Sequence, residues 1–425
     1  MSSINFMGKL LDGVDVEWKA LGTLGELVRG NGLQKKDFTE TGVPAIHYGQ
    51  IYTYYGLATT ETKSFVSPEL AKQLRKVDKG DVVITNTSEN LEDVGKALVY
   101  LGERQAVTGG HATILKPGKC LLGKYFAYFT QTEEFASEKR KYAKGTKVID
   151  VSATDMAKIN IPIPCPENPK KSLEIQAEIV RILDTFTELT TELTTELTTE
   201  LTTRKKQYNY YRDQLLSFED GEVEWKTLPE MALDFGRGKS KHRPRNDEKL
   251  YGGDIPFIQT GDIRSASHII MQYNQTYSAF GLKQSKLWPK GTLCITIAAN
   301  IAETSILGFD ACFPDSVIGF VADPKKTSTD YVEYLLQSVK NKLEEKGKEK
   351  SSAQSNINLA TFEQLKLPFP SLPEQARIVS ILDKFDALTN SITEGLPREI
   401  ELRQKQYAHY RDLLLSFPKQ AEVTG

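Results

Sequence analysis

The side chains with the clearest chemical potential lie in a basic stretch in the second half of the sequence. Residues 237–249 read RGKSKHRPRNDEK, with six Lys or Arg side chains against two acidic ones. Glycine and proline mark the stretch as a loop, and such a loop can follow a phosphate backbone. A solvated surface loop would have the same composition, so both interpretations stay open. The candidate phosphate contacts are Arg237, Lys239, Lys241, Arg243 and Arg245.

Groups that can recognise bases come directly after this loop and recur in the first half of the chain. The second half offers an amide, a hydroxyl, a carboxylate and a guanidinium, which hydrogen-bond base edges in DNA grooves, and the first half offers aromatic side chains next to an amide. The two stretches are VPAIHYGQI at 43–51 and IPFIQTGDI at 255–263. A tyrosine-rich core or rim would give the first of them the same composition. The candidates are Gln259, Thr260, Asp262 and Arg264 in the second half, and Tyr48, Gln50 and Tyr52, with Lys35 and Lys36 before them, in the first.

A third pair of polar loops precedes the last predicted strand of each half. These loops span residues 144–147 and 351–356. Both are polar enough to reach DNA. Their candidate contacts are Lys144, Lys147, Ser351, Ser352 and Gln354.

A long internal repeat must position these groups. IQAEIVRILDTF at 175–186 returns as EQARIVSILDKF at 374–385, and RKKQYNYYRDQLLSF at 204–218 returns as RQKQYAHYRDLLLSF at 403–417. Eight of 12 and 11 of 15 residues match, both at an offset of 199 residues. A repeat at this spacing indicates a duplicated half-protein. The fold is therefore expected as two halves around a pseudo-twofold axis, in a circular arrangement with the chain ends close together.

Both copies of the repeat read as long amphipathic helices, because their apolar residues recur every three or four positions. The first copy contains TELT four times between Thr187 and Thr202. Threonine forms helices poorly, so this array is expected to need a partner helix. Shared periodicity predicts that the copies pack on each other; two independent helices are the alternative. The expected pairing residues are Leu189, Leu193, Leu197, Leu201, Leu388, Ile392, Leu396 and Ile400.

Between the helices lie two divergent globules. The first is expected to contain strands at 44–51, 81–85, 97–101, 112–115 and 159–163, with one helix over residues 121–144. The second follows the same plan: KGDVVIT at 79–85 matches KGTLCIT at 290–296, and Tyr125 and Tyr128 match Tyr331 and Tyr334. Residues 7–19 resemble the segment at 215–226, so the chain is expected to begin like the tail of a helix.

Composition narrows the possible functions. The net charge is −2, so nucleic-acid binding would have to rely on local patches. The four cysteines and five histidines show no metal-ligand or catalytic-triad spacing, and each is expected as a packing or surface residue. Dinucleotide-binding and phosphate-loop glycine motifs are absent. Lacking a signal-peptide core or a membrane-length apolar run, the chain is expected in the cytoplasm.

The repeated helices and the TELT array carry a resemblance that covers the entire chain. The sequence resembles the DNA-specificity subunits of type I restriction–modification systems, in the subgroup with a repeated four-residue motif in the central spacer. The resemblance implies two target recognition domains, each reading half of a split double-stranded DNA site, held apart by two antiparallel helices. It also implies assembly with two methyltransferase subunits that use S-adenosylmethionine. ATP-driven restriction subunits, which would bind ATP and Mg, would join them in the full complex.

The expected fold is thus two mixed α/β recognition domains separated by long antiparallel coiled-coil helices. The expected domains are residues 1–165 and 219–370 for recognition, 166–218 for the central helix, and 371–425 for the C-terminal helix and tail. No cofactor is expected on this chain, and no catalysis. Two other functions stay open. A coiled-coil adaptor that binds protein would have no affinity for duplex DNA, and an enzyme would need a further catalytic domain.

Overall fold

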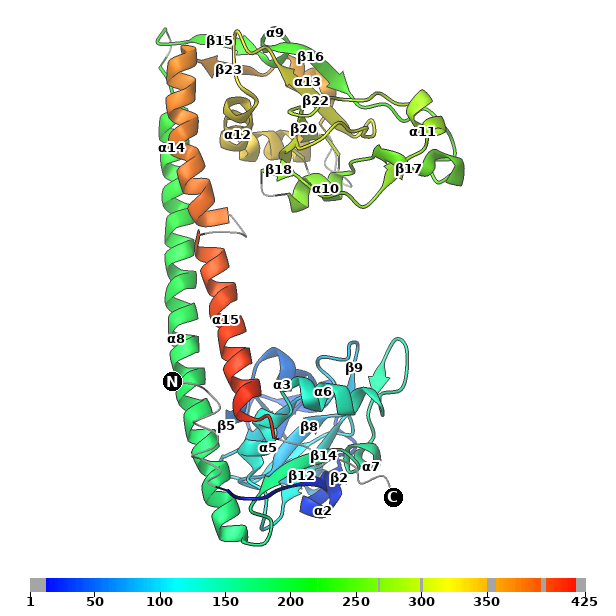
Figure 1. The fold of residues 1–425 in the computed structure, drawn as a ribbon, viewed down its shortest axis with the longest axis vertical. Helices are drawn as coiled ribbons and strands as arrows, with labels where there is room; N and C mark the ends of the chain where they lie inside the picture. The colour runs from blue at the N-terminus through cyan, green and yellow to red at the C-terminus, as the bar shows by residue number, and fades with distance from the viewer. Residues whose placement is uncertain are drawn as a thin grey trace. The chain divides into compact units, whose positions relative to one another are not determined.

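The computed structural model describes residues 13–219, 221–266, 268–298, 301–349, 357–390 and 395–417. The chain divides into two compact units, residues 1–194 with 402–425 and residues 195–401. Each unit contains one mixed α/β module, as expected (Figure 1). The long helix α8 (Pro169–Leu215) runs through the boundary between Thr194 and Thr195, so each unit holds part of it.

The first module is built on two five-stranded sheets. The main sheet has the order β2 (Gly25–Arg29), β12 (Ala112–Pro117), β8 (Val82–Thr85), β10 (Ala97–Tyr100) and β5 (Ala58–Thr59). The second has the order β3 (Phe38–Thr39), β6 (Ser64–Val66), β4 (Val43–Ile46), β11 (Ala106–Thr108) and β7 (Arg75–Val77). A separate antiparallel pair joins β1 (Val16–Ala20) to β14 (Asn160–Pro164). Strands β8 and β10 are entirely buried, as their continuous apolar runs predict.

The second module repeats the main sheet and keeps little of the second one. Its five strands have the order β16 (Ala232–Arg237), β22 (Val317–Ala322), β20 (Leu293–Thr296), β21 (Thr304–Leu307) and β18 (Ile269–Ile270). As in the first module, three antiparallel pairings are followed by a parallel one at the edge. β15 (Glu224–Thr227) pairs with β23 (Lys366–Phe369), and β17 (Tyr251–Pro256) with β19 (Thr276–Tyr277). The duplication inferred from the helices therefore extends to the modules.

Two local expectations about the first module were wrong. The predicted single helix over 121–144 is two helices, α5 (Gly123–Phe129) and α6 (Glu133–Arg140). The Thr132 hydroxyl accepts the Phe135 amide proton and so starts α6 afresh. The predicted strand over 44–51 ends at Ile46, because His47 Nδ1 accepts from the Gly49 amide at 3.2 Å and begins α3 (Tyr48–Thr53).

Each module packs on one copy of the repeated helix through a continuous apolar core. In the first unit, Ile179 and Leu183 of α8 are fully buried in the core that contains Phe126 and Phe129. In the second unit, Ile378 and Leu382 of α14 (Leu372–Asn390) are fully buried in the core of the second module. The equivalent residues of the two copies therefore do the same packing.

Inside each unit, α8 also contacts a helix of the second repeat copy. In the first unit, Phe186 of α8 lies against Tyr410 of α15 (Gly395–Leu414), with ring centroids 6.0 Å apart. In the second, Tyr211 of α8 stacks on Phe385 of α14 at 5.7 Å. These two contacts are equivalent under the 199-residue offset, and their numbering runs in opposite directions. The same two helix positions therefore meet in both units.

The helical repeats differ from the expectation in one respect. The second copy consists of two helices, α14 and α15, and Gly395 has a φ of +78°, outside the helical range. Ile392 lies outside the described residues, as do residues 7–12 of the expected N-terminal helix tail. Leu189 is 56% exposed and Leu388 36%, whereas Leu193, Leu197, Leu201, Leu396 and Ile400 are partly buried. Direct pairing of these side chains, the domain boundaries and the circular arrangement stay predictions.

Candidate nucleic-acid interface

The basic loop after β16 separates into arginines that hold the fold and lysines that face solvent. Arg245 donates to both carboxylate oxygens of Asp315, at 2.9 and 3.0 Å. Arg237 Nε donates to the Asp315 carbonyl at 2.6 Å, and Arg243 donates to the Ser240 carbonyl at 2.6 Å. Lys239, Lys241 and the three arginines are all exposed, so the difference lies in the partners that the arginines have. The lysines are therefore the better candidates for phosphate contact, because the arginines already have protein partners.

Internal hydrogen bonds give this loop a defined shape. The Asp247 carboxylate accepts from the Lys249 amide at 3.1 Å and lies 2.8 Å from His242 Nε2. These two bonds, the backbone bond first, lower the pKa of Asp247. The Tyr251 hydroxyl donates to the Arg245 carbonyl at 2.5 Å. A loop that is fixed in this way holds its exposed lysines in place before any ligand arrives.

The group of candidates after the loop surrounds the short helix α10 (Thr260–Ser265). Gln259 precedes this helix and Arg264 lies in its last turn, and both are exposed. Thr260 is partly buried. Asp262 was expected to read bases, but it is 5% exposed and its two oxygens accept from Gln259 N at 2.8 Å and Asn274 Nδ2 at 2.7 Å. Its role is to hold α10 in place, which leaves Gln259 and Arg264 as the accessible groups.

In the first module, the corresponding helix α3 places an aromatic group between two histidines. The Tyr48 ring lies 4.6 Å from that of His47 and 4.9 Å from that of His111. Burial, His111 and Lys35 lower the pKa of His47. Gln50 was also expected to read bases, but its amide donates to Ser64 Oγ at 2.6 Å. His47 is partly buried and His111 is exposed; the sequence had led us to expect both as packing or surface residues rather than as groups of the interface.

A matching position in the other module is the signal that identifies His47. VPAIHYGQI and IPFIQTGDI place His47 where the second module has Gln259. Both residues immediately precede the equivalent short helices α3 and α10. His111 has no such signal, because it reaches Tyr48 and Thr87 only through the fold.

The other candidates of the first module lie apart along its loops. Lys35 and Lys36 are exposed in the short helix η1 (Lys35–Asp37), and Tyr52 is partly buried in α3. Lys144 and Lys147 are both exposed, and Lys144 forms an ion pair with Asp155 at 3.1 Å. Ser351, Ser352 and Gln354 lie outside the described residues.

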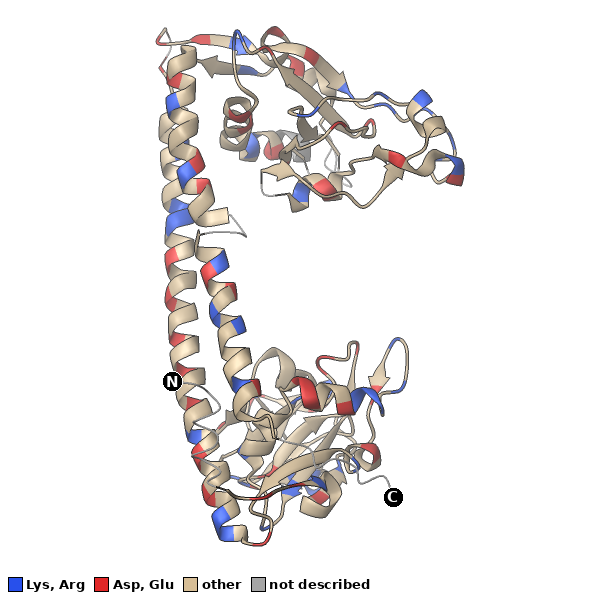
Figure 2. Cartoon of the chain, in the orientation of Figure 1, with Lys and Arg blue, Asp and Glu red and all other residues tan. Residues whose placement is uncertain are grey.

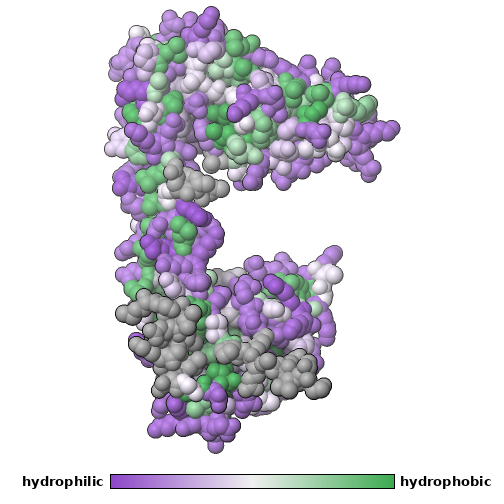
Figure 3. Space-filling model, in the orientation of Figure 1, coloured by the Kyte–Doolittle hydropathy of each residue, from purple (hydrophilic) through white to green (hydrophobic). Residues whose placement is uncertain are grey.

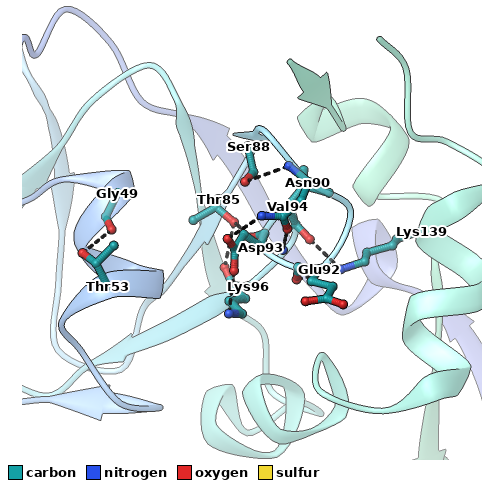
Figure 4. A network of polar contacts seen from close by, with 10 residues as sticks. All are labelled: Gly49, Thr53, Thr85, Ser88, Asn90, Glu92, Asp93, Val94, Lys96 and Lys139. Atoms are coloured by element: carbon teal, nitrogen blue, oxygen red, sulfur yellow. Dashed lines mark hydrogen bonds and ion pairs between the residues drawn. The ribbon is translucent and has the colours of Figure 1, made fainter. Parts of the chain in front are cut away.

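Glu89, Glu92 and Asp93 belong to a tightly held loop that follows β9 (Thr87–Ser88) and lies beside α3 (Figure 4). Lys139 is 6% exposed and donates to the carbonyls of Val94 at 2.7 Å and Glu92 at 3.3 Å. Burial lowers the pKa of Lys139 to about 8. Asp93 accepts from Lys96 at 2.6 Å and from Asn90 at 2.9 Å. The tip of this loop is exposed at residues 89–92, whereas its base at Val94 is buried.

The described residues contain neither of two features that the sequence also argued against. None of their clusters of His, Cys, Asp and Glu has the arrangement to hold a metal ion. None of their helices combines the length and apolar character that spanning a bilayer requires. Acidic and basic residues are interspersed on both modules (Figure 2). On the face drawn in Figure 3, the second module shows apolar residues scattered among hydrophilic ones.

Comparison with known proteins decides the family. A family model described as the type I restriction modification DNA specificity domain matches residues 13–203 and 223–402. The chain belongs to this family. It is 37% identical to the EcoR124I/EcoR124II specificity subunit of Escherichia coli over 433 residues, covering 100% of both chains. This specificity-domain protein is also 31% identical to a putative type I specificity subunit of Haemophilus influenzae, over 97% of this chain and 98% of that relative.

Solved structures share the fold of this specificity-domain protein. A chain from a study of complex assembly and conformational transition of the type I R-M system aligns with a TM-score of 0.68. That alignment covers 94% of this chain and 97% of the other, at 14% identity. The HsdS subunit of Thermoanaerobacter tengcongensis aligns with a TM-score of 0.52 at 15% identity, over 94% and 95% of the two chains. Both likenesses support the architecture of two modules and long helices.

Replacing Lys239 and Lys241 together by Ser should weaken binding to any duplex without changing sequence preference. Each lysine that contacts a phosphate contributes close to one unit to the slope of log affinity against log salt, so we expect the slope to fall by about two. The measurement is a titration of non-specific duplex DNA at several salt concentrations. Lys325→Ser/Lys326→Ser, at a different loop of the same module, is the charge-matched control. An unchanged slope in the Lys239/Lys241 variant would exclude the loop from the interface.

Replacing Gln259 and Arg264 together by Ala should instead alter which bases the second module prefers. Each good bidentate base contact contributes roughly 1–3 kcal/mol of discrimination. The measurement is selection of bound sequences from a random duplex library. We expect the base preference to relax in one half of the selected site and to stay unchanged in the other half. If preference changed in both halves, or not at all, α10 would not be a reading element.

Proposed function

We propose that this protein is the DNA-specificity subunit of a type I restriction–modification complex and that it binds a bipartite double-stranded DNA site. One observation carries the proposal: a chain of this family repeats one module on each of two repeated helices, with different polar groups at equivalent positions. His47 and Gln259 occupy the same place before α3 and α10. Each module would therefore read its own half-site, and the two half-sites would differ.

Specificity subunits of type I systems are non-catalytic, and catalysis resides on their partner subunits. We extend this division to the cofactors. S-adenosylmethionine would bind the methyltransferase subunits, and ATP and Mg the restriction subunits. The complex would act on DNA in the cytoplasm. A protein-binding adaptor with no DNA role is not favoured by the family membership.

Two methyltransferase subunits would bind through the repeated helices. Tyr211 is 47% exposed and its equivalent Tyr410 42%. Ala177 and Ala376 are also identical and exposed. Contacts with Phe385 and Phe186 account for part of the identity of the two tyrosines, but the exposed Ala177 and Ala376 also match, whereas the modules have diverged widely. Two identical exposed surfaces in one chain suit two copies of the same partner.

The decisive experiment is sequencing of methylated DNA from cells that produce this chain with its methyltransferase subunit. We expect one split motif with two different halves and an unread gap. The purified chain alone, free of the partner, should transfer no methyl group. Methylation at a continuous motif, or methyl transfer by the single chain, would contradict the proposal.

The TELT array is proposed as the spacer that sets the gap. α8 remains helical through all four repeats. Hydroxyl groups along the array bond the carbonyl four residues earlier, as Thr199 does to Thr195 at 2.8 Å and Thr202 to Thr198 at 2.9 Å. A unit of four residues can therefore be added or removed without changing this internal pattern. It corresponds to about 6 Å and about 1.1 turns of helix.

Deleting Thr199–Thr202 should shorten the gap by about one base pair. The 6 Å loss would allow nearly two base pairs at about 3.4 Å each. α14 and α15 keep their length, however, and the residual rotation of roughly 40° matches one base pair, at about 34°. With half-site centres about one DNA turn apart, the intact protein should leave about six to eight unread pairs.

The measurement is again the methylated motif, compared before and after the deletion. Thr199→Ala/Thr202→Ala keeps the length and serves as control, so its gap should stay unchanged. A deletion that left the gap intact, or that altered bases within either half-site, would show that the array is not the spacer.

A further inference from the structure

The structure attaches each module to its long helix through a buried glutamine. Gln176 of α8 is fully buried; its Oε1 accepts from the Leu122 amide and its Nε2 donates to the Cys120 carbonyl, both at 2.8 Å. These partners immediately precede α5. Gln375 is the equivalent residue of α14 and is 2% exposed. It accepts from Thr327 Oγ1 at 2.9 Å and donates to the Lys326 carbonyl at 3.1 Å, just before α12 (Thr329–Glu349).

A tyrosine–aspartate pair forms a second attachment at the same distance along each helix. The Tyr128 hydroxyl of α5 donates to Asp184 Oδ1 of α8 at 2.7 Å. The Tyr334 hydroxyl of α12 donates to Asp383 Oδ1 of α14, also at 2.7 Å. Burial raises the pKa of both phenols, so each remains a protonated donor at neutral pH. The two attachments of a module are eight residues apart on the long helix, roughly 12 Å.

In the first unit, the second attachment also includes the returning helix. Thr187 Oγ1 lies 3.0 Å from the Tyr128 hydroxyl and 2.9 Å from the Tyr407 hydroxyl of α15. Thr187 is the first residue of the TELT array. Asp184 also binds Lys124 Nζ at 2.8 Å. The module, the long helix and the returning helix therefore meet at one polar cluster.

The remaining contact between each module and its helix is mainly apolar. Ile179 and Leu183 pack among the aromatic residues of the first module, and Ile378 and Leu382 pack in the second. Apolar burial is non-directional, so it holds a module against the helix without strongly fixing its rotation about the helix. Hydrogen bonds require defined distances and angles. Two such attachments, far apart on one helix, fix the orientation that apolar packing leaves open.

We propose that Tyr128 with Asp184, and Tyr334 with Asp383, are positioning residues that set the number of unread base pairs between the two half-sites. This proposal rests on the bipartite DNA binding proposed above. A module that rotates about its helix carries its reading surface along and around the duplex. One base pair corresponds to about 3.4 Å and about 34°, so a small rotation suffices to accept a neighbouring gap length. The bases read by each module would stay the same.

The test compares Tyr128→Phe and Tyr334→Phe in the complete complex with its methyltransferase subunits. Each variant is assayed on duplexes that carry the native half-sites with the native gap, or with one base pair more or fewer. We expect the preference for the native gap to fall roughly three- to tenfold, as the loss of one hydrogen bond implies. The effect of Tyr334→Phe should be larger, because Lys124 still holds Asp184 in the first unit.

Tyr125→Phe and Tyr331→Phe are the matched controls. These tyrosines lie on the same two helices, are fully buried and donate to the Pro162 carbonyl at 2.8 Å and the Pro368 carbonyl at 3.1 Å, inside their own modules. Their variants lose the same chemical group but no bond to the long helix. We expect them to keep the native gap preference.

The proposal is overturned if the controls broaden the gap as much as Tyr128→Phe and Tyr334→Phe do. It is also overturned if these two variants weaken all gap lengths equally, or if they change the bases read. Failure of the underlying function would look different, because the unmodified complex would then methylate no split site at all. A split site in the unmodified complex, with unaltered gap preference in both variants, refutes the positioning role alone.

Discussion

The structure depends on covering the apolar face of the repeated helix. Ile179, Leu183, Ile378 and Leu382 are all fully buried, each against the core of a module. Burying one such side chain contributes about 1.5–3 kcal/mol relative to leaving it exposed. Helix and module therefore stabilise each other, and neither would be expected to persist without its counterpart. The threonine-rich middle of α8, with its weak helix propensity, continues between two segments that are fixed in this way.

This constraint explains which parts of the two halves stay alike. The glutamines and tyrosines that join a module to its helix are identical in the two halves: Tyr128 and Tyr334 each donate to an aspartate, and Gln176 and Gln375 each donate to a backbone carbonyl. Residues before α3 and α10 differ, because nothing in the packing requires them to match. The second sheet of the first module is reduced to β17, β19 and isolated bridges in the second. The differences between the two halves therefore lie mainly away from the repeated helices.

Sequence periodicity and comparison of the two halves predicted the long helices and most strands correctly, because these depend on local and repeated features of the sequence. The strands at 81–85, 97–101, 112–115 and 159–163 appear as β8, β10, β12 and β14, and the matched tyrosines make the same bonds in both modules. The candidate interface was less predictable, since it depends on partners distant in sequence. Arg245 is hydrogen-bonded to Asp315, Gln50 to Ser64 and Asp262 to Asn274. No local pattern shows whether a polar side chain already has such a partner.

The division of the chain into units has a consequence for its synthesis. The core of the first module includes Leu414, Leu415 and Phe417 together with Val16. All strands of that module have been synthesised once the chain reaches Pro164. Leu414, Leu415 and Phe417 of its core are synthesised only after the whole second module. The nascent first module must wait with an incomplete core, and such long-range closure is slow. Premature termination within α15 would accordingly destabilise the first module more than the second module, although the second module lies nearer to α15 in the sequence.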